Sequence, residues 1–339
     1  MSCRAPRPNP HADPMVGIRF LDEPAAPTPP SPTPAGKVGN PPDAPGPAPV
    51  PRRQRERPIG LISFLAVVAA GVAVKLGGGT LPLPTTVEQS FGRSFVVDSS
   101  PQVVVETFDG PIEIIRGEPG RVDCRVEARC RGLGQAGAEA NLARMGVSIV
   151  QEGNRIRISI APGPGARVRK SSASVTVIVP EDASIRLATS HGRIKVQGIE
   201  GPVQARSSNG EIDVRGARGI VSLESRNGRI SCQADQAIVA LESSNGSIEF
   251  NGSLAPGLSA LKTNNGRITL RLPDDQVFHL DAHSNNGRVS SDFDDLEAAH
   301  RAVMIRDDSN APTPGIVVKA RSGNGSIRVL SSGIALSHP

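Results

Sequence analysis

The sequence predicts an all-β repeat fold, a β-solenoid of the β-helix or β-prism type built from coils of 18–21 residues. Gly192, Gly210, Gly228 and Gly246 follow one another at intervals of 18 residues. Apolar residues alternate with polar ones on both sides of each glycine, as in strands with one buried face. The composition of Trp 0, Tyr 0 and Phe 8 requires a core of aliphatic side chains.

Residues 1–57 form a proline-rich arm, with 16 of the 31 prolines of the chain before Arg52. Such a segment has few backbone donors and little apolar surface, so it cannot offset the entropy of folding. We expect a disordered, partly polyproline-II spacer on the cytoplasmic side of a membrane.

Residues 58–83 are predicted to be a transmembrane signal-anchor helix and its exit, followed by a linker at 84–94. Residues 59–74 carry no charge, and four arginines precede them between positions 52 and 57. A spanning helix needs about 20 apolar residues, and Lys75 can extend its stem along the apolar surface. A cleaved signal peptide and a buried soluble helix remain the alternatives. The arginines predict a single-pass inner (plasma) membrane protein with its N-terminus in the cytoplasm and its C-terminal domain extracytoplasmic.

The β-repeat domain is expected over residues 95–332, with a short tail at 333–339. Its first part is less regular than the rest. Alternation predicts strands and an alanine-rich run predicts one short helix. The strands are expected at 121–129, 147–150, 155–160 and 174–179, and the helix at 133–145.

Eight copies of one pattern define the repeat. The residue three places before each glycine is always Ser or Thr, and the residue two places after is always Ile or Val. Asn precedes six of the glycines, and Asp109 and His191 precede the other two. The turn positions are Gly110, Gly192, Asn209, Gly210, Asn227, Gly228, Asn245, Gly246, Asn265, Gly266, Asn286, Gly287, Asn324 and Gly325.

The pattern describes a strand, a tight turn and a second strand. Asn and Gly tolerate positive φ, which we expect at these turns. An antiparallel meander and a parallel solenoid both satisfy the alternation. The recurrence of Asn and of Ser/Thr favours the solenoid, in which each stacks on its equivalent as a hydrogen-bonded ladder. The 38-residue interval from Gly287 to Gly325 predicts an interrupted coil with a loop or short helix leaving the stack.

In stacked coils, residues at the same position of successive repeats form a column. The columns that point outward supply the candidate binding surface. Parallel stacking would place Glu211 between Arg193 and Arg229. It would also place Asp213 beside Lys195, and Arg206 beside Glu224. Exposed pairs of this kind contribute only about 0–1 kcal/mol each but favour the register. The candidate residues are Arg193, Lys195, Arg206, Glu211, Arg229, Arg267 and Arg288.

Catalytic and metal-binding patterns are weak. The outward columns show no repeated acidic pair, and neither a G-x-S-x-G motif nor a P-loop occurs. The sequence therefore predicts a non-enzymatic chain without a cofactor. Acidic residues within 292–308 and the histidines His279, His283 and His300 could hold a metal, but their spacing matches no known site, and a solvated surface is the simpler interpretation. Cys124 and Cys130 are too far apart along one strand for a disulfide.

The formal charge of +5 is modest, with arginines interleaved among acids. A chain with 2% aromatic residues also has few platforms on which bases could stack. Nucleic acid is therefore not an expected partner.

Residues 175–214 read VTVIVPEDASIRLATSHGRIKVQGIEGPVQARSSNGEIDV. This segment resembles the bacterial putative-adhesin family, in which a strand ending in Val-Pro precedes repeated Thr/Ser-Ser-x-Gly-x-Ile units. The resemblance covers about residues 95–330 and implies an envelope-associated β-repeat domain, frequently behind one membrane segment. It carries no catalytic residues to transfer.

These observations together predict an envelope-associated binding or scaffold module that is adhesin-like and contacts a polymer or a protein. Two alternatives remain. The regular last copy, at residues 327–329, leaves open self-assembly into a β-solenoid polymer. A polysaccharide-active β-helix enzyme would instead require two acids on one exposed face.

Overall fold

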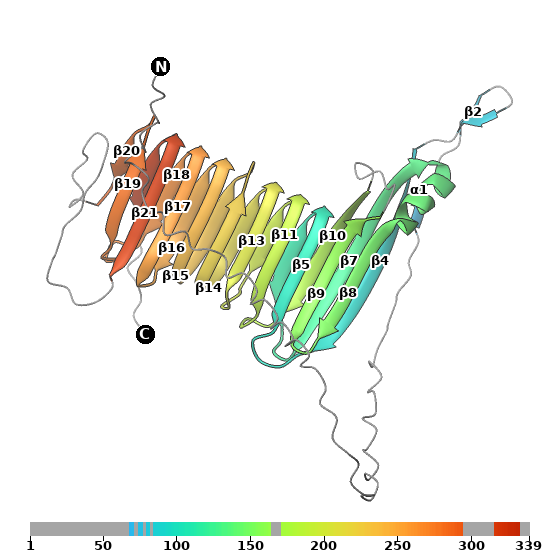
Figure 1. Ribbon diagram of the computed structural model, residues 1–339, viewed down its shortest axis with the longest axis horizontal. Helices are drawn as coiled ribbons and strands as arrows, with labels where there is room; N and C mark the ends of the chain where they lie inside the picture. Colours follow the sequence, from blue (N-terminus) through green and yellow to red (C-terminus); the bar gives the residue numbers. More distant parts are fainter. Residues whose placement is uncertain are drawn as a thin grey trace, which may run out of the picture. The chain divides into compact units, whose positions relative to one another are not determined.

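The computed structural model describes residues 68–70, 74–76, 79–81, 84–163, 171–293 and 315–332. These residues form strands and a single helix, α1 (Gly134–Ala143), so the described part is all-β with one short helix, as predicted (Figure 1). The predicted arm at 1–57 and tail at 333–339 lie outside the described residues.

The strands before the regular repeats agree with the sequence-based expectation. The predicted helix at 133–145 is α1, and each predicted strand of this region has a counterpart. The bounds are β4 (Pro84–Val96), β7 (Arg121–Leu133), β8 (Met145–Glu152), β9 (Arg155–Pro162) and β10 (Ser171–Val179). β7 pairs antiparallel with both β4 and β10.

Each repeat is a rung, by which we mean the strand before a turn glycine, the turn, and the strand after it. Each rung takes the number of its glycine. The rung strands are β5 (Gln102–Asp109), β6 (Ile112–Arg116), β11 (Ser184–His191), β12 (Ile194–Gln197), β13 (Val203–Asn209), β14 (Ile212–Ser225), β15 (Ile230–Asn245), β16 (Ile248–Leu254), β17 (Gly257–Asn265), β18 (Ile268–Leu272), β19 (His279–Ser284), β20 (Val289–Ser291), β21 (Ile316–Asn324) and β22 (Ile327–Ser331).

Neighbouring rungs pair in parallel with equivalent columns in register. Ile194 lies opposite Ile212, and Ile212 lies opposite Ile230. Leu187 lies opposite Ala205 in the same way on the other side of the turn. The antiparallel meander is therefore not the arrangement of these repeats.

Two rows of strands enclose the core. Strands that precede the glycines pair with one another, and so do strands that follow them, while β14 and β15 contribute to both rows. Leu223 from the first row and Ile230 from the second belong to one buried cluster. A fully buried Ile or Leu contributes about 1.5–3 kcal/mol, so the aliphatic columns supply the main stabilisation.

The order of the last two rungs in space differs from their order in sequence. β21 pairs with β17 on one side and β19 on the other, and β22 pairs with β18 and β20 in the same way. The Gly325 rung thus lies between the Gly266 and Gly287 rungs. Residues 327–329, the regular last copy in sequence on which the self-assembly alternative was based, are therefore not at an end of the described stack. The loop or short helix predicted within the 38-residue interval falls on residues 294–314, which lie outside the described part.

The segment predicted to be a membrane helix is different in its described parts. Residues 68–70, 74–76 and 79–81 are the short strands β1 (Val68–Ala70), β2 (Val74–Leu76) and β3 (Gly79–Leu81). β1 pairs antiparallel with β4, with Val68 opposite Glu88 and Ala70 opposite Thr86. In the part of the chain that the structure describes, no helix combines the length and apolar character needed to cross a bilayer.

The predicted linker at 84–94 was also wrong. These residues form most of β4, which pairs along its whole length with β7, and Val87 is buried. The alternation of TTVEQSFGRSFV is that of a strand, but the paired residues of β7 lie 25 to 49 residues away along the chain, so local pattern alone did not identify it.

Candidate functional site: the turn edge

The turn glycines stack on one another along one edge of the described sheet, which we call the turn edge. A Cβ built on Gly228 would lie 2.1 Å from the carbonyl oxygen of Gly210, and one on Gly246 would lie 2.1 Å from that of Gly228. Gly110 and Gly325 have positive φ, whereas the other six column glycines and the turn asparagines do not. The expectation of positive φ was therefore mostly wrong, and close backbone approach is what requires glycine here.

The Ser/Thr column holds neighbouring rungs together from inside. Ser225 Oγ donates to the carbonyl of Gly210 at 3.1 Å, and Thr263 Oγ1 donates to that of Gly246 at 3.0 Å. The same bond recurs for Ser207, Ser243, Ser284 and Ser322. These hydroxyls are buried and bind glycine carbonyls rather than one another, so their role is structural.

The asparagines form the predicted ladder on the outside of the turns. In each step an Asn Nδ2 donates to the Oδ1 of the Asn on the neighbouring rung at 2.8 Å. The order is Asn209, Asn227, Asn245, Asn265, Asn324 and Asn286. This ladder passes through Asn324 before Asn286 and so follows the spatial order of the rungs.

The residues directly after the glycines form a second row along the turn edge. Each of their carbonyls accepts a hydrogen bond from the Ile one residue further along the neighbouring rung, at 2.9–3.0 Å. In spatial order the row is Arg193, Glu211, Arg229, Ser247, Arg267, Ser326 and Arg288. We call it the arginine row, because arginine holds every second place in it.

The rungs nearest the N-terminal strands are neutralised by ion pairs. Arg193 Nη2 lies 2.9 Å from Glu211 Oε2, as predicted, and Lys195 Nζ lies 3.0 Å from Glu113 Oε1. Asp213 lies beside Lys195 in register, but its carboxylate pairs with Arg215 at 3.0 Å. The sequence thus predicted that these side chains are neighbours but missed two of their actual partners.

The rungs at the other end carry unpaired positive charge. Arg229 and Arg288 are exposed and have no ion-pair or side-chain hydrogen-bond partner among the described residues, and Arg267 Nε donates only to Ser326 Oγ, at 3.3 Å. The structure adds Arg226 and Arg328, which flank this part of the row. Sequence reasoning missed Arg328, because its rung lies between two others only in space.

Arg206 does not belong to the turn edge. It lies on the outer face of the other strand row, in β13, where its Nε donates to Glu224 Oε2 at 2.9 Å as predicted. Glu224 lies opposite Glu242 in register, and Glu242 Oε1 lies 3.2 Å from Lys262 Nζ. This acidic pair was missed at the sequence level. Each carboxylate is held by a cation, and neither residue lines a described cavity, so the pair has no substrate pocket.

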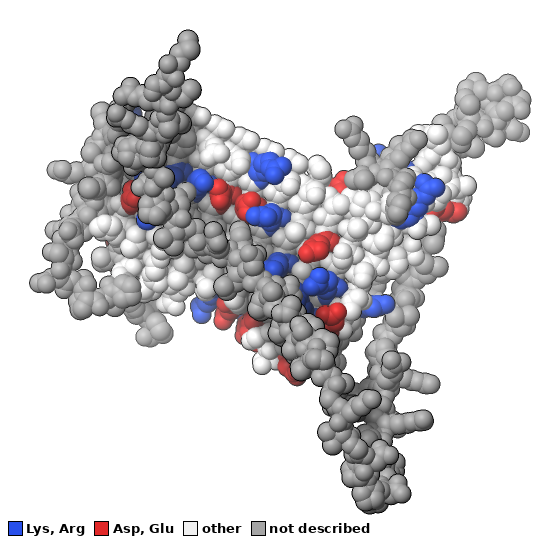
Figure 2. Space-filling model, in the orientation of Figure 1, with Lys and Arg blue, Asp and Glu red and all other residues white. Residues whose placement is uncertain are grey.

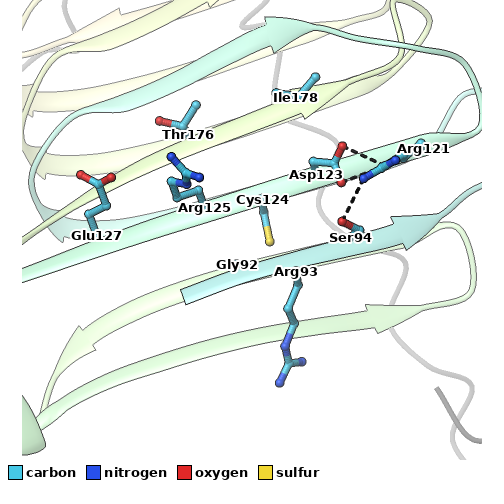
Figure 3. Close-up of a pocket in the computed structure, with 10 residues that line it drawn as sticks. All are labelled: Gly92, Arg93, Ser94, Arg121, Asp123, Cys124, Arg125, Glu127, Thr176 and Ile178. Carbon is cyan, nitrogen blue, oxygen red and sulfur yellow. Dashed lines mark hydrogen bonds and ion pairs between the residues drawn. The ribbon is translucent and has the colours of Figure 1, made fainter. Parts of the chain in front are cut away.

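A cavity of about 730 Å³ lies on the outer face of β4, β7 and β10 (Figure 3). Arg121 Nε donates to Asp123 Oδ1 at 2.9 Å, and Arg121 Nη2 donates to Ser94 Oγ at 3.4 Å. Burial raises the pKa of the Cys124 thiol to about 11, so this cysteine is not a thiolate nucleophile at neutral pH. Among the residues that line the cavity, Arg121, Asp123 and Ser94 satisfy one another.

Cys124, Cys130 and Cys232 are buried free thiols. No cluster of metal-ligating side chains occurs within residues 84–163, 171–293 and 315–332. Most of the acidic segment 292–308 and His300 lie outside the described residues. His279 and His283 project from β19, and His283 Nε2 lies 3.0 Å from Asn285 Oδ1.

Charges of both signs are interspersed on the face shown in Figure 2, without a large field of one sign.

No family model matches the sequence, and no curated protein matches it. Similar solved structures include three bacterial proteins. A putative cell adhesion protein from Clostridium sporogenes shares 12% identity over 72% of this chain and 100% of its own, with a TM-score of 0.31. A putative adhesin from Bacteroides fragilis shares 14% over 72% and 97%, with a TM-score of 0.38. A putative adhesin from Parabacteroides distasonis shares 11% over 71% and 97%, with a TM-score of 0.22.

All three are named as adhesion proteins. That name is also the name of the family that the repeat motif resembles. Identities and TM-scores of this size leave the fold and function of this chain to be argued from its own strands and side chains.

Proposed function

We propose that this chain is a non-enzymatic, adhesin-like binding or scaffold module of the cell envelope, and a member of the putative-adhesin family. We further infer that its parallel rungs are the coils of a β-solenoid. The observation that supports the binding role is the turn edge, where ladders of hydrogen bonds fix outward side chains at intervals of about 4.8 Å. Such a rigid array suits a repetitive polymer or a protein surface.

The proposal also places the repeat domain outside the cytoplasm. The arginines between positions 52 and 57 and the uncharged stretch after them support attachment to the inner (plasma) membrane near this point of the chain. The described part of residues 58–83 consists of β1 to β3, so we assign it no spanning helix. Alkaline phosphatase, which is active only outside the cytoplasm, can be fused after residue 57 or after residue 94. We expect activity only from the second fusion. Equal activity from both fusions would contradict this topology.

Binding can be tested with the immobilised full-length protein and fractionated envelope polysaccharides and proteins. We expect retention at low salt that falls as ionic strength rises, because exposed charges are screened over about 10 Å at 0.1 M salt. Absence of any retained envelope component at low salt would contradict the binding role.

Self-assembly is a second candidate, but its basis has changed. The last repeat in sequence is internal, so the ends of the described rung stack are β19 and β20, each paired on one side only among the described strands. Edge strands of this kind can pair with another copy. Sedimentation that depends on concentration would support assembly, and a monomer at all concentrations would exclude it.

A further inference from the structure

The arginines of the turn edge recur at every second rung. In space, Arg193, Arg229, Arg267 and Arg288 alternate with Glu211, Ser247 and Ser326. Neighbouring rungs are about 4.8 Å apart, so the arginine positions recur at about 9.6 Å. The regular spacing depends on the Gly325 rung, which places Ser326 between the last two arginines.

Three of these arginines are available to a ligand. Arg193 is neutralised by Glu211, whereas Arg229, Arg267 and Arg288 are exposed and have no carboxylate partner among the described residues. Other charged groups near this part of the edge are mostly basic. Arg226 and Arg328 add positive charge. Three residues after the turn glycine, the rungs from Gly228 to Gly287 carry one carboxylate, which is Glu249.

The asparagine ladder supplies neutral donors beside the arginine row. Each amide nitrogen has two N–H groups, and the ladder uses one of them. The second N–H at each exposed rung can donate to a hydroxyl or ring oxygen of a ligand. The edge therefore offers one amide per rung and one cation per two rungs.

The composition narrows the class of ligand. With Trp 0, Tyr 0 and Phe 8, the chain cannot bind neutral sugars or bases through a series of stacked aromatic rings. Charge and hydrogen bonds must then supply the affinity. A linear sugar chain advances per residue by about the spacing of neighbouring strands, so a charge on alternate sugars matches a cation on alternate rungs.

We propose that Arg229, Arg267 and Arg288 bind a linear acidic glycan that carries one carboxylate or sulfate on every second sugar and lies along the turn edge. The inference rests on the proposed binding function and names its ligand class. Arg226 and Arg328 add to the local positive potential, and the asparagine amides contact the sugar oxygens.

The test compares four polymers with the full-length protein. The probes are a polymer with one carboxylate per disaccharide, polygalacturonate with one per sugar, neutral dextran, and single-stranded DNA. We expect the first to bind most tightly and to be released by salt. Dextran binding as tightly as the acidic polymers, or tighter binding of the DNA, would overturn the proposal.

Matched variants locate the site. The triple variant Arg229→Gln, Arg267→Gln and Arg288→Gln should bind the alternating polymer at least tenfold more weakly. The control is Arg121→Gln, Arg206→Gln and Arg215→Gln, which removes the same charge from arginines held in ion pairs. It should stay within about twofold of the wild type, and equal urea midpoints would show that folding is not the cause.

A gain-of-function variant tests the spacing itself. Ser247→Arg with Ser326→Arg places a cation on every rung from 228 to 287, and should shift preference towards polygalacturonate by at least threefold. No shift would contradict the spacing argument.

If wild type retains an envelope polymer while both triple variants retain it equally, the glycan inference is wrong but the binding function stands. If wild type retains nothing, both are wrong.

Discussion

At the scale of single residues, backbone contact between rungs decides which residue type fits at each position of the turn. The carbonyl of one turn glycine occupies the space where the next glycine would carry its Cβ. The hydroxyl three residues earlier binds that same carbonyl. Glycine and Ser/Thr therefore recur together because they contact one atom, and a change to either should affect the same junction.

Gly228→Ala should destabilise the fold by about 1–3 kcal/mol, because its Cβ would meet the Gly210 carbonyl at 2.1 Å and the rungs must move apart. Urea unfolding followed by circular dichroism measures the effect. Gly92→Ala is the matched control, since its nearest non-neighbouring atom would lie at 3.9 Å. A cost for Gly228→Ala no larger than for the control would contradict the role of close approach.

Two threonines in the same column should respond differently to replacement by valine. Thr263 Oγ1 donates to Gly246, whereas Thr189 Oγ1 is buried without a partner. Thr263→Val should cost about 1 kcal/mol, and Thr189→Val should be neutral or stabilising, because no bond is lost and a buried polar group is removed. Thermal unfolding of the two variants side by side provides the measurement. Equal losses would show that the hydroxyl bonds contribute nothing.

Cys232 should not react with a thiol reagent in the native state at pH 8. Burial raises its pKa to about 12, and the reactive thiolate forms only when pH approaches that value. Its side chain is also 2% exposed. Alkylation followed by mass spectrometry should find Cys232 unlabelled in buffer and labelled in urea. Rapid native labelling would mean that the Gly228 rung opens readily.

At the scale of elements, the asparagine ladder ties the turns into one unit. Each internal Asn donates to one neighbour and accepts from the other, whereas Asn286 at the terminal rung donates to Asn324 only. Because all members are exposed, each bond contributes modestly, and its main effect is to fix the register of the turns that carry the arginine row.

Asn245→Ala should therefore destabilise more than Asn286→Ala. The first variant loses two ladder bonds and the second loses one, at about 0.5–1.5 kcal/mol each. Urea midpoints of both variants, measured with the Asn209→Ala variant of the first ladder Asn as a third member, give the comparison. If all three positions cost the same, the ladder would not act through its neighbour contacts.

At the scale of the whole described fold, the repeat that ends the sequence is an internal part of the stack. Val318, Ala320, Ile327 and Val329 of the Gly325 rung are at most 1% exposed. Backbone bonds join this rung to both neighbours, from Ile268 to Ser326 and from Ile327 to Arg288. The position of a repeat in sequence is thus no guide to its exposure here.

Ending the chain after Pro314 should be far more destabilising than removing a terminal repeat of a simple linear stack. The truncation removes a buried rung and separates the Gly287 rung from the one rung that it pairs with among the described strands. We expect a lower urea midpoint and a smaller m-value, because less surface is buried. Ending the chain after Ser332 is the control and should leave both values unchanged. An unchanged midpoint after the Pro314 truncation would contradict the internal placement.

Much of the turn edge could be predicted from sequence because its constraints repeat. The Asn ladder and the Arg193–Glu211 and Arg206–Glu224 pairs follow from one register applied at every rung. The partners of Lys195 and Asp213 could not be predicted, because long charged side chains choose among several neighbours at similar cost. The strand β4 was missed because its partner is remote in sequence.

By itself the sequence determined the all-β class and the repeated positions, and it favoured parallel stacking in register, since each is set by contacts that recur every 18–21 residues. Only the tertiary structure decided the order of the last two rungs. The Gly287 and Gly325 rungs carry the same Gly, Ser and Asn at the turn, so either could pair with the Gly266 rung by these residues. In the structure it is the Gly325 rung that does. This order also places Ser326 between Arg267 and Arg288, so the arginines of the proposed binding edge are evenly spaced.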